Sequence, residues 1–167
     1  EIRSKLIKVS TRKIENGKSV YMNDGIIYLN DGVDEKKVID HSEIRLKGDH
    51  NISNTLLAIG AAWAAGIGIT AIKKAVSSFK GVAHRLEFVR ELEGVKYFND
   101  TAATMPEAAI SGLNSFSEPV ILICGGSDKN LDMAEFGKEI ARKAKGVIFF
   151  RGLGTEKIVR CIQENLG

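Results

Sequence analysis

The chain has 167 residues, of which 44% are hydrophobic and 27% are charged, and it contains only 2 Pro. This length and balance are typical of one globular domain or two small ones, and they exclude long disordered stretches. The net charge of +3 is small, and the Lys and Arg residues are spread along the sequence rather than grouped. We therefore expect no nucleic-acid partner and no role at a membrane surface.

No apolar run approaches the roughly 20 residues needed to cross a bilayer, and the amino terminus lacks a signal-peptide pattern. These features predict a cytoplasmic protein. Cys124 and Cys161 have no cysteine or histidine partner close in sequence, so we interpret both as buried free thiols. The three histidines are scattered singly, and no set of residues has the spacing of a zinc site. We predict no metal site formed by this chain.

Residues 1–47 alternate short apolar runs with turn signals, which is typical of β-strands. We expect hairpin turns at Asn16-Gly17 and at residues 23–25, between runs at residues 19–22 and 26–29. Residues 7–10 read as a strand with almost nothing before it to pair with. We therefore expect the chain to begin inside a larger domain.

The pattern becomes helical at Asn51, from which apolar residues recur at every third or fourth position. A second helix follows, with Thr70 as its N-cap and Gly81 at its end. We place a domain boundary there, which divides the chain into residues 1–80 and residues 81–167.

The second domain opens with two predicted strands around a Glu93-Gly94 turn. Apolar strands then alternate with amphipathic helices. The expected strands are residues 120–124 and 147–150, and the expected helices are residues 105–114, 133–144 and 155–165. This alternation predicts an α/β fold with a Rossmann-like, mostly parallel sheet covered on both faces. Counting one of the two strands that open the domain, a core of three parallel strands is small for such a sheet, so we expect this domain to be incomplete.

Ligands of parallel sheets collect at the carboxyl ends of the strands, and residues 99–104 form the first loop in such a position. In a structural interpretation, Thr104 and Glu107 form a capping box and Pro106 occupies the first helical turn. In a functional interpretation, Asp100 holds a ribose hydroxyl and Thr104 holds an anion. Spacing alone favours the structural interpretation.

The second loop, residues 125–130, begins with two glycines and contains Lys129. Glycines let the backbone approach a ligand closely, and Lys129 supplies a charge for a carboxylate or phosphate. A tight turn would use the same glycines, so both interpretations stay open. The third loop, residues 151–155, is interpreted as little more than a connection.

Gly17-Lys18-Ser19 resembles the end of a phosphate-binding P-loop. However, Arg12 stands where that pattern requires glycine, and no helix is expected to follow. We predict a hairpin turn here. If the protein uses ATP, its main phosphate-binding loop lies outside this chain.

Four motifs in order resemble the Mur ligases: G-D-H-N-I-S-N at residues 48–54, H-R-L-E at residues 84–87, N-D-T-A-A-T at residues 99–104 and G-G-S-D-K at residues 125–129. Each motif is weak alone, but the ordered set is specific and covers nearly the whole chain. The resemblance is closest to the members that add D-glutamate to UDP-N-acetylmuramoyl-L-alanine. It implies that residues 1–80 end the central ATP-binding domain and residues 81–167 begin the carboxy-terminal, amino-acid-binding domain.

The resemblance also implies an ATP site. Asn51 and Asn54 would face the adenine, since side-chain amides offer both a donor and an acceptor and positions i and i+3 share a helix face. Arg85 would reach the ATP phosphates when the domains close, and Asp100 would hold the ribose. Two plainer interpretations remain, with Asn51 as an N-cap and Arg85 as a surface charge at a hinge.

For the amino acid, the resemblance implies that Thr104 and Lys129 receive the carboxylate of D-glutamate. Many relatives have a lysine where this chain has Ala102. Any contact made by that lysine is therefore absent here.

The implied activity is that of an ATP-dependent amide ligase of peptidoglycan precursor synthesis, acting through an acyl phosphate with Mg²⁺ held mostly outside this chain. We expect a monomer when full length, with UDP-N-acetylmuramoyl-L-alanine and D-glutamate as substrates, and no activity from the chain alone. Alternatives are another Mur-type ligase, a folylpolyglutamate synthase, or a non-catalytic Rossmann-type nucleotide-binding module. Lys129 and the absence of a D-N-P-R-like loop favour glutamate, and the absence of a G-x-G-x-x-G opening disfavours the module.

Overall fold

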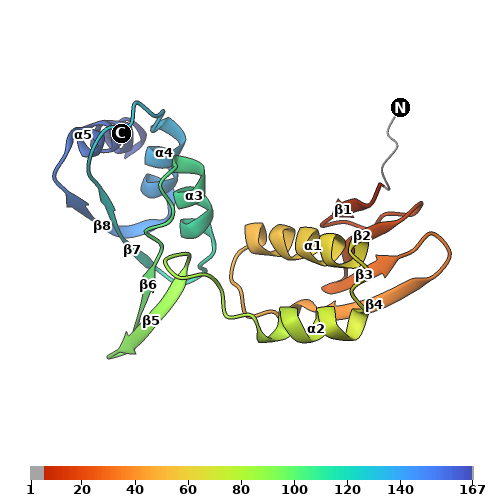
Figure 1. Ribbon diagram of the computed structural model, residues 1–167. Helices are drawn as coiled ribbons and strands as arrows, with labels where there is room; N and C mark the ends of the chain where they lie inside the picture. Colours follow the sequence, from red (N-terminus) through yellow and green to blue (C-terminus); the bar gives the residue numbers. More distant parts are fainter. Residues whose placement is uncertain (1–5, 167) are drawn as a thin grey trace. The chain divides into compact units, whose positions relative to one another are not determined.

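The computed structural model describes residues 6–166 and shows two compact units, Glu1–Gly81 and Val82–Gly167 (Figure 1). Each unit has its own β-strands and its own apolar core. In the described part of the chain, no helix is long and apolar enough to cross a membrane.

The first unit contains a four-stranded sheet in the order β1-β2-β3-β4. Its strands are β1 (Lys8–Ser10), β2 (Ser19–Asn23), β3 (Ile26–Asn30) and β4 (Glu35–Asp40). β2 and β3 pair antiparallel around Asp24 and Gly25, so this predicted hairpin is confirmed. β1 instead pairs parallel to β2, and the hairpin expected at Asn16-Gly17 is wrong. Residues 11–18 carry the chain back to the start of the sheet, so that Lys8 lies beside Ser19.

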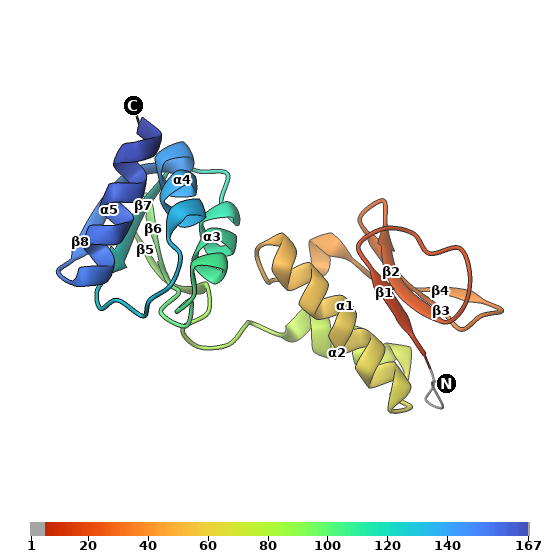
Figure 2. The ribbon, with the colours of Figure 1, turned by 90° about the horizontal axis from the view of Figure 1, so that it is seen from above.

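Both helices of the first unit lie on one side of its sheet (Figure 2). They are α1 (Asp49–Ala64) and α2 (Ile69–Ser78), preceded by the short 3₁₀ helix η1 (His41–Glu43). The apolar positions of α1 that recur at helical spacing, Ile52, Leu56 and Ile59, are buried against the strands. The expected N-cap is wrong for α2, because Gly68 occupies that position and Thr70 lies inside the first turn.

The second unit contains two two-stranded sheets and three helices. Its elements are β5 (Glu87–Leu92), β6 (Val95–Asn99), α3 (Pro106–Asn114), β7 (Val120–Gly125), α4 (Ala134–Lys143), β8 (Ala144–Phe150) and α5 (Leu153–Leu166). β5 and β6 form the expected hairpin at Glu93-Gly94, and β7 pairs parallel to β8. The predicted α/β class is confirmed. The expected set of three parallel strands is wrong, because the described residues contain one parallel pair in this unit, β7 and β8.

One face of the β7–β8 sheet is covered by helices, with α4 and α5 side by side (Figure 2). Leu122, Cys124, Val147 and Phe149 point into the core that these helices close. The residues that alternate with them are exposed: Ile121 61%, Ile123 58%, Ile148 56% and Phe150 62%. The sheet is therefore apolar on both faces, as the sequence indicates, but the expectation that both faces are covered is wrong for the described residues.

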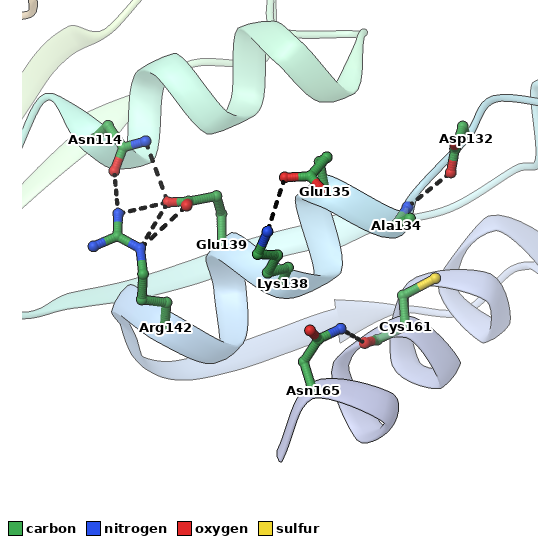
Figure 3. Close-up of polar contacts among 9 residues, drawn as sticks. All are labelled: Asn114, Asp132, Ala134, Glu135, Lys138, Glu139, Arg142, Cys161 and Asn165. Atoms are coloured by element: carbon green, nitrogen blue, oxygen red, sulfur yellow. Dashed lines mark hydrogen bonds and ion pairs between the residues drawn. The ribbon is translucent and has the colours of Figure 1, made fainter. Parts of the chain in front are cut away.

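A polar network joins α3 to α4 on the surface of the second unit (Figure 3). The Arg142 guanidinium pairs with Glu139 at 2.6 Å and donates to the Asn114 carbonyl oxygen at 3.2 Å. Asn114 also donates to Glu139, at 3.3 Å. The Arg142 side chain lowers the pKa of Glu139 below its ordinary value. The network fixes the end of α3 against the last turns of α4.

Candidate functional site

Residues 84–87 and residues 99–102 of the second unit are held together by a set of hydrogen bonds. The Leu86 amide donates to Asp100 Oδ1 at 2.9 Å, and the Ala102 amide donates to the His84 carbonyl at 2.9 Å. Asn99 Nδ2 and His84 Nδ1 lie 2.8 Å apart. Because β6 ends at Asn99, this strand end presents both segments at one place.

Arg85 lies in the middle of the first of these segments, with an exposed side chain. Its neighbours have left-handed backbone, with φ of 64° at His84 and 45° at Leu86. For residues other than glycine this conformation costs about 1–2 kcal/mol each. The bonds from residues 99–102 hold the backbone there, so Arg85 is presented by a strained turn that a second loop stabilises.

Asp100 is half-buried, and its carboxylate has a structural partner on each side. Oδ1 accepts from the Leu86 amide, and Oδ2 lies against α3, where a side chain at Gly112 would come within 2.5 Å of it. A carboxylate can accept about four hydrogen bonds, so capacity for a ribose hydroxyl remains. The structure thus brings Arg85 and Asp100 together through Leu86.

Thr104 does not form the capping box expected with Glu107, because Met105 is the N-cap of α3 and no side chain caps this helix end. Pro106 does occupy the first helical turn, as predicted. The loop closes on itself instead, through the Ala103 amide to the Asp100 carbonyl and the Thr104 amide to the Ala102 carbonyl. The structural interpretation of Thr104 is therefore wrong, and its side chain is exposed.

Lys129 lies on the loop between β7 and α4, with an exposed side chain. The loop starts at Gly125 and Gly126, whose φ angles of 105° and 123° belong to a region that favours glycine. Asp128 pairs with Lys157 of α5 at 2.6 Å, and this contact lowers the pKa of the Asp128 carboxyl. The loop that carries Lys129 is thus joined to α5 through Asp128.

The third loop, interpreted from sequence as a connection, in fact supports the second. The Thr155 hydroxyl accepts from the Gly126 amide at 2.9 Å and donates to the Phe150 carbonyl at 2.5 Å. Sequence reasoning did not select Thr155 or Lys157. A signal that could have found Thr155 is its hydroxyl directly after Gly152 and Gly154, since glycines allow a close approach of backbones. Lys157 has no such signal.

Asn51 and Asn54 lie in the first two turns of α1 in the first unit, in different surroundings. Asn51 is buried, and its amide donates to the Lys47 carbonyl at 2.7 Å, whereas Asn54 is exposed. Asn51 is not the N-cap of the helix, since Gly48 holds that position. A ligand could use the Asn51 side-chain oxygen, the second N–H of the Asn51 side chain and the whole Asn54 side-chain amide.

Cys124 and Cys161 are free thiols, each half-buried rather than fully buried. Burial raises the pKa of the Cys124 thiol to about 11, which makes it a poor nucleophile at neutral pH. Within residues 6–166, no group of three or more His, Cys, Asp or Glu side chains is placed to hold a metal ion.

Solved structures share this fold. MurF from Acinetobacter baumannii has a TM-score of 0.66 at 17% identity, over 86% of this chain and 35% of that protein. Folylpolyglutamate synthase from Thermotoga maritima has a TM-score of 0.58 at 20% identity, over 87% of this chain and 37% of that protein. The chain therefore shares the α/β fold of these structures, with a Rossmann-like second unit.

Residues 84–166 match the family described as "Mur ligase, glutamate ligase domain". A relative from Roseiflexus sp. (strain RS-1) is 44% identical over 75% of this chain and 27% of its own length. Another, from Caldanaerobacter subterraneus subsp. tengcongensis, is 38% identical over 93% of this chain and 33% of its own length. Both are named "UDP-N-acetylmuramoylalanine--D-glutamate ligase". The chain belongs to the Mur ligase family, and it spans about a third of the length of these relatives.

Proposed function

We propose that this chain is part of an ATP-dependent ligase that joins D-glutamate to UDP-N-acetylmuramoyl-L-alanine. Residues 1–80 would end its central ATP-binding domain, and residues 81–167 would begin its carboxy-terminal domain. The observation that carries the proposal is the loop arrangement in the second unit, where Arg85, Asp100 and Lys129 stand at strand ends with fixed backbones. Names of relatives 38–44% identical to the chain support the choice of substrates.

The chemistry sets what these residues must do. A carboxylate is a poor acyl donor, so its oxygen first attacks the γ-phosphorus of ATP to give an acyl phosphate and ADP. The amine of D-glutamate then attacks the acyl carbon, the C–O bond to phosphate breaks, and inorganic phosphate leaves with the amine proton released to solvent. The protein contributes positioning and stabilisation of phosphate charge. Magnesium would offset part of that charge, with ligands mostly outside this chain.

Arg85 would pair with the ATP phosphates, because a planar guanidinium can donate two hydrogen bonds to one phosphate. Asp100 would accept from a ribose hydroxyl with the capacity that the Leu86 amide leaves. Asn51 and Asn54 would face the adenine. For Asn51 the side-chain oxygen and the second N–H of the side-chain amide remain for this role, since one N–H is donated to the Lys47 carbonyl.

Thr104 and Lys129 would receive the carboxylate of D-glutamate. Both side chains are exposed at the ends of strands, and the hydroxyl of Thr104 caps no helix. Residue 102 is alanine here, where many relatives have lysine. Lys129 is therefore the one cation in the two loops, residues 99–104 and 125–130. ATP and a nucleotide-linked precursor are cytoplasmic metabolites, so we place the enzyme in the cytoplasm. We propose that the full-length enzyme is a monomer.

Two alternatives differ in what they predict. Another amide ligase, such as a folylpolyglutamate synthase, shares the fold but would join different substrates. A non-catalytic nucleotide-binding module would bind ATP without releasing phosphate. The Thr104 and Lys129 loops favour a ligase, because a module needs no amino-acid site.

The test is an assay of phosphate release by the full-length polypeptide that contains these residues. With ATP, Mg²⁺ and UDP-N-acetylmuramoyl-L-alanine present, D-glutamate should support release, whereas L-lysine, L-glutamate and D-alanine should not. Release that depends on L-lysine would overturn the substrate assignment. Release with none of these amino acids, despite tight ATP binding, would favour the module.

A further inference from the structure

Thr155 is the third residue of α5 and is 9% exposed, although it is polar. Its hydroxyl has one hydrogen to donate, and it donates that hydrogen to the Phe150 carbonyl at 2.5 Å. It also accepts from the Gly126 amide at 2.9 Å. This one side chain therefore links the end of β8 to the first residues of the loop that carries Lys129.

The backbones of the two loops also meet directly. The Gly154 amide donates to the Gly126 carbonyl at 3.0 Å. A Cβ atom at Gly152 would collide with that same carbonyl, and one at Gly125 would collide with the Thr155 hydroxyl. The contact needs the absence of side chains at these positions, so the relative placement of the two loops allows little variation.

Lys157, one half-turn further along α5, holds the next part of the loop. Its ammonium pairs with Asp128 Oδ2 at 2.6 Å, while Asp128 Oδ1 accepts from the Asn130 amide at 2.8 Å. Asp128 and Asn130 are the residues on either side of Lys129. The chain is therefore fixed at both neighbours of Lys129, while the Lys129 side chain itself is exposed.

We infer that Thr155 is a positioning residue for amino-acid binding, assisted by Lys157, because it fixes the loop from which Lys129 reaches its carboxylate. Neither side chain touches the substrate. The inference rests on the proposed role of Lys129, and it goes further by giving the third strand-end loop the task of holding the second.

The experiment uses the full-length polypeptide and measures KM for D-glutamate, KM for ATP and the midpoint of thermal unfolding. Thr155→Val keeps the shape and removes both hydrogen bonds, and it should raise KM for D-glutamate about 10-fold. KM for ATP should change less than about 2-fold. Thr155→Ser keeps the hydroxyl and should restore KM for D-glutamate to near the wild-type value.

Lys157→Gln provides a second, exposed variant that remains informative if Thr155→Val fails to fold. It should raise KM for D-glutamate by about 3-fold and raise the pKa of Asp128 toward its ordinary value, as followed by carboxyl NMR. Lys138→Gln is the matched control, because it removes an exposed lysine that pairs with Glu135 within α4 rather than with Asp128. It should leave both KM values unchanged.

Lys129→Met tests the proposed role of Lys129 separately from the positioning role of Thr155. If it leaves KM for D-glutamate unchanged, the proposed role of Lys129 fails. If it raises that KM while folded Thr155→Val and Lys157→Gln do not, the positioning role fails alone. Equal increases in both KM values for Thr155→Val, without rescue by serine, would also overturn the inference, since a general structural defect would explain them.

Discussion

Arg85 lies between two residues with left-handed backbone, His84 and Leu86. If Arg85 binds phosphate as proposed, holding its guanidinium on a strained but bonded turn would reduce the motion that must be lost on binding. The Asp100 carboxylate takes part in this arrangement through the Leu86 amide. A ribose ligand of Asp100 and a phosphate ligand of Arg85 would thus share one rigid support.

We predict that Arg85→Ala in the full-length polypeptide lowers kcat by about 10²-fold to 10³-fold, because charge stabilisation at the transferring phosphoryl group is lost. The Kd for ATP should weaken by less than about 10-fold, since adenine and ribose contacts remain. Arg85→Lys, the matched control, keeps the charge without the two-donor geometry. Its kcat should lie between those of the wild type and of Arg85→Ala. Steady-state kinetics and equilibrium nucleotide binding provide the measurements, and an unchanged kcat for the alanine variant would contradict the phosphate role.

At this scale the sequence identified the residue types but not their partners. Asn51 and Asn54 lie at helical spacing, yet one is buried on the Lys47 carbonyl and the other is exposed, which spacing does not reveal. Thr155 was missed because its importance depends on Gly126, 29 positions away in sequence. Contacts of this kind depend on strand pairing, which a local pattern does not contain.

At the scale of elements, α4 and α5 approach closely at Gly137. A Cβ atom placed there would collide with the Cβ of Cys161 and would lie 2.9 Å from the Cys161 carbonyl carbon. The obstruction is backbone of the facing helix rather than a flexible side-chain end, so it cannot easily move away. Thr155 and Lys157 lie in the first two turns of the same helix.

Gly137→Ala should therefore lower the free energy of unfolding of the second unit by about 1–3 kcal/mol through overpacking, despite the better helix propensity of alanine. Gly146→Ala is the control, because a Cβ atom at Gly146 meets nothing within 4 Å. It should change stability by less than about 1 kcal/mol. Urea unfolding of both variants tests this, and equal stabilities would show that the two helices can separate at no cost.

Periodicity predicted the helices and most strands to within a few residues, since burial of one face repeats along each element. It failed where an element end or a pairing depends on the rest of the fold. The parallel pairing of β1 with β2 could not be read from Asn16-Gly17, which looks like a hairpin signal. Likewise Thr70 and Thr104 have the right residue type for an N-cap, but Gly68 and Met105 hold those positions.

At the scale of the whole molecule, the relatives are about three times as long as this chain. The G-K-S sequence at residues 17–19 leads into β2 rather than a helix, so it is not a phosphate-binding loop. The exposed face of the β7–β8 sheet could not be predicted from the sequence, because apolar strands have the same pattern whether or not a second layer covers them. We expect the 167-residue chain alone to have no ligase activity.

The most direct test of the account follows one oxygen atom through the reaction. UDP-N-acetylmuramoyl-L-alanine labelled with ¹⁸O in its carboxylate is incubated with the full-length polypeptide, ATP, Mg²⁺ and D-glutamate, and the released phosphate is analysed by mass spectrometry. An acyl phosphate transfers one carboxylate oxygen to phosphate when the amine attacks, so each phosphate formed from doubly labelled substrate should contain one ¹⁸O. Phosphate released without ¹⁸O would contradict carboxylate activation by this protein.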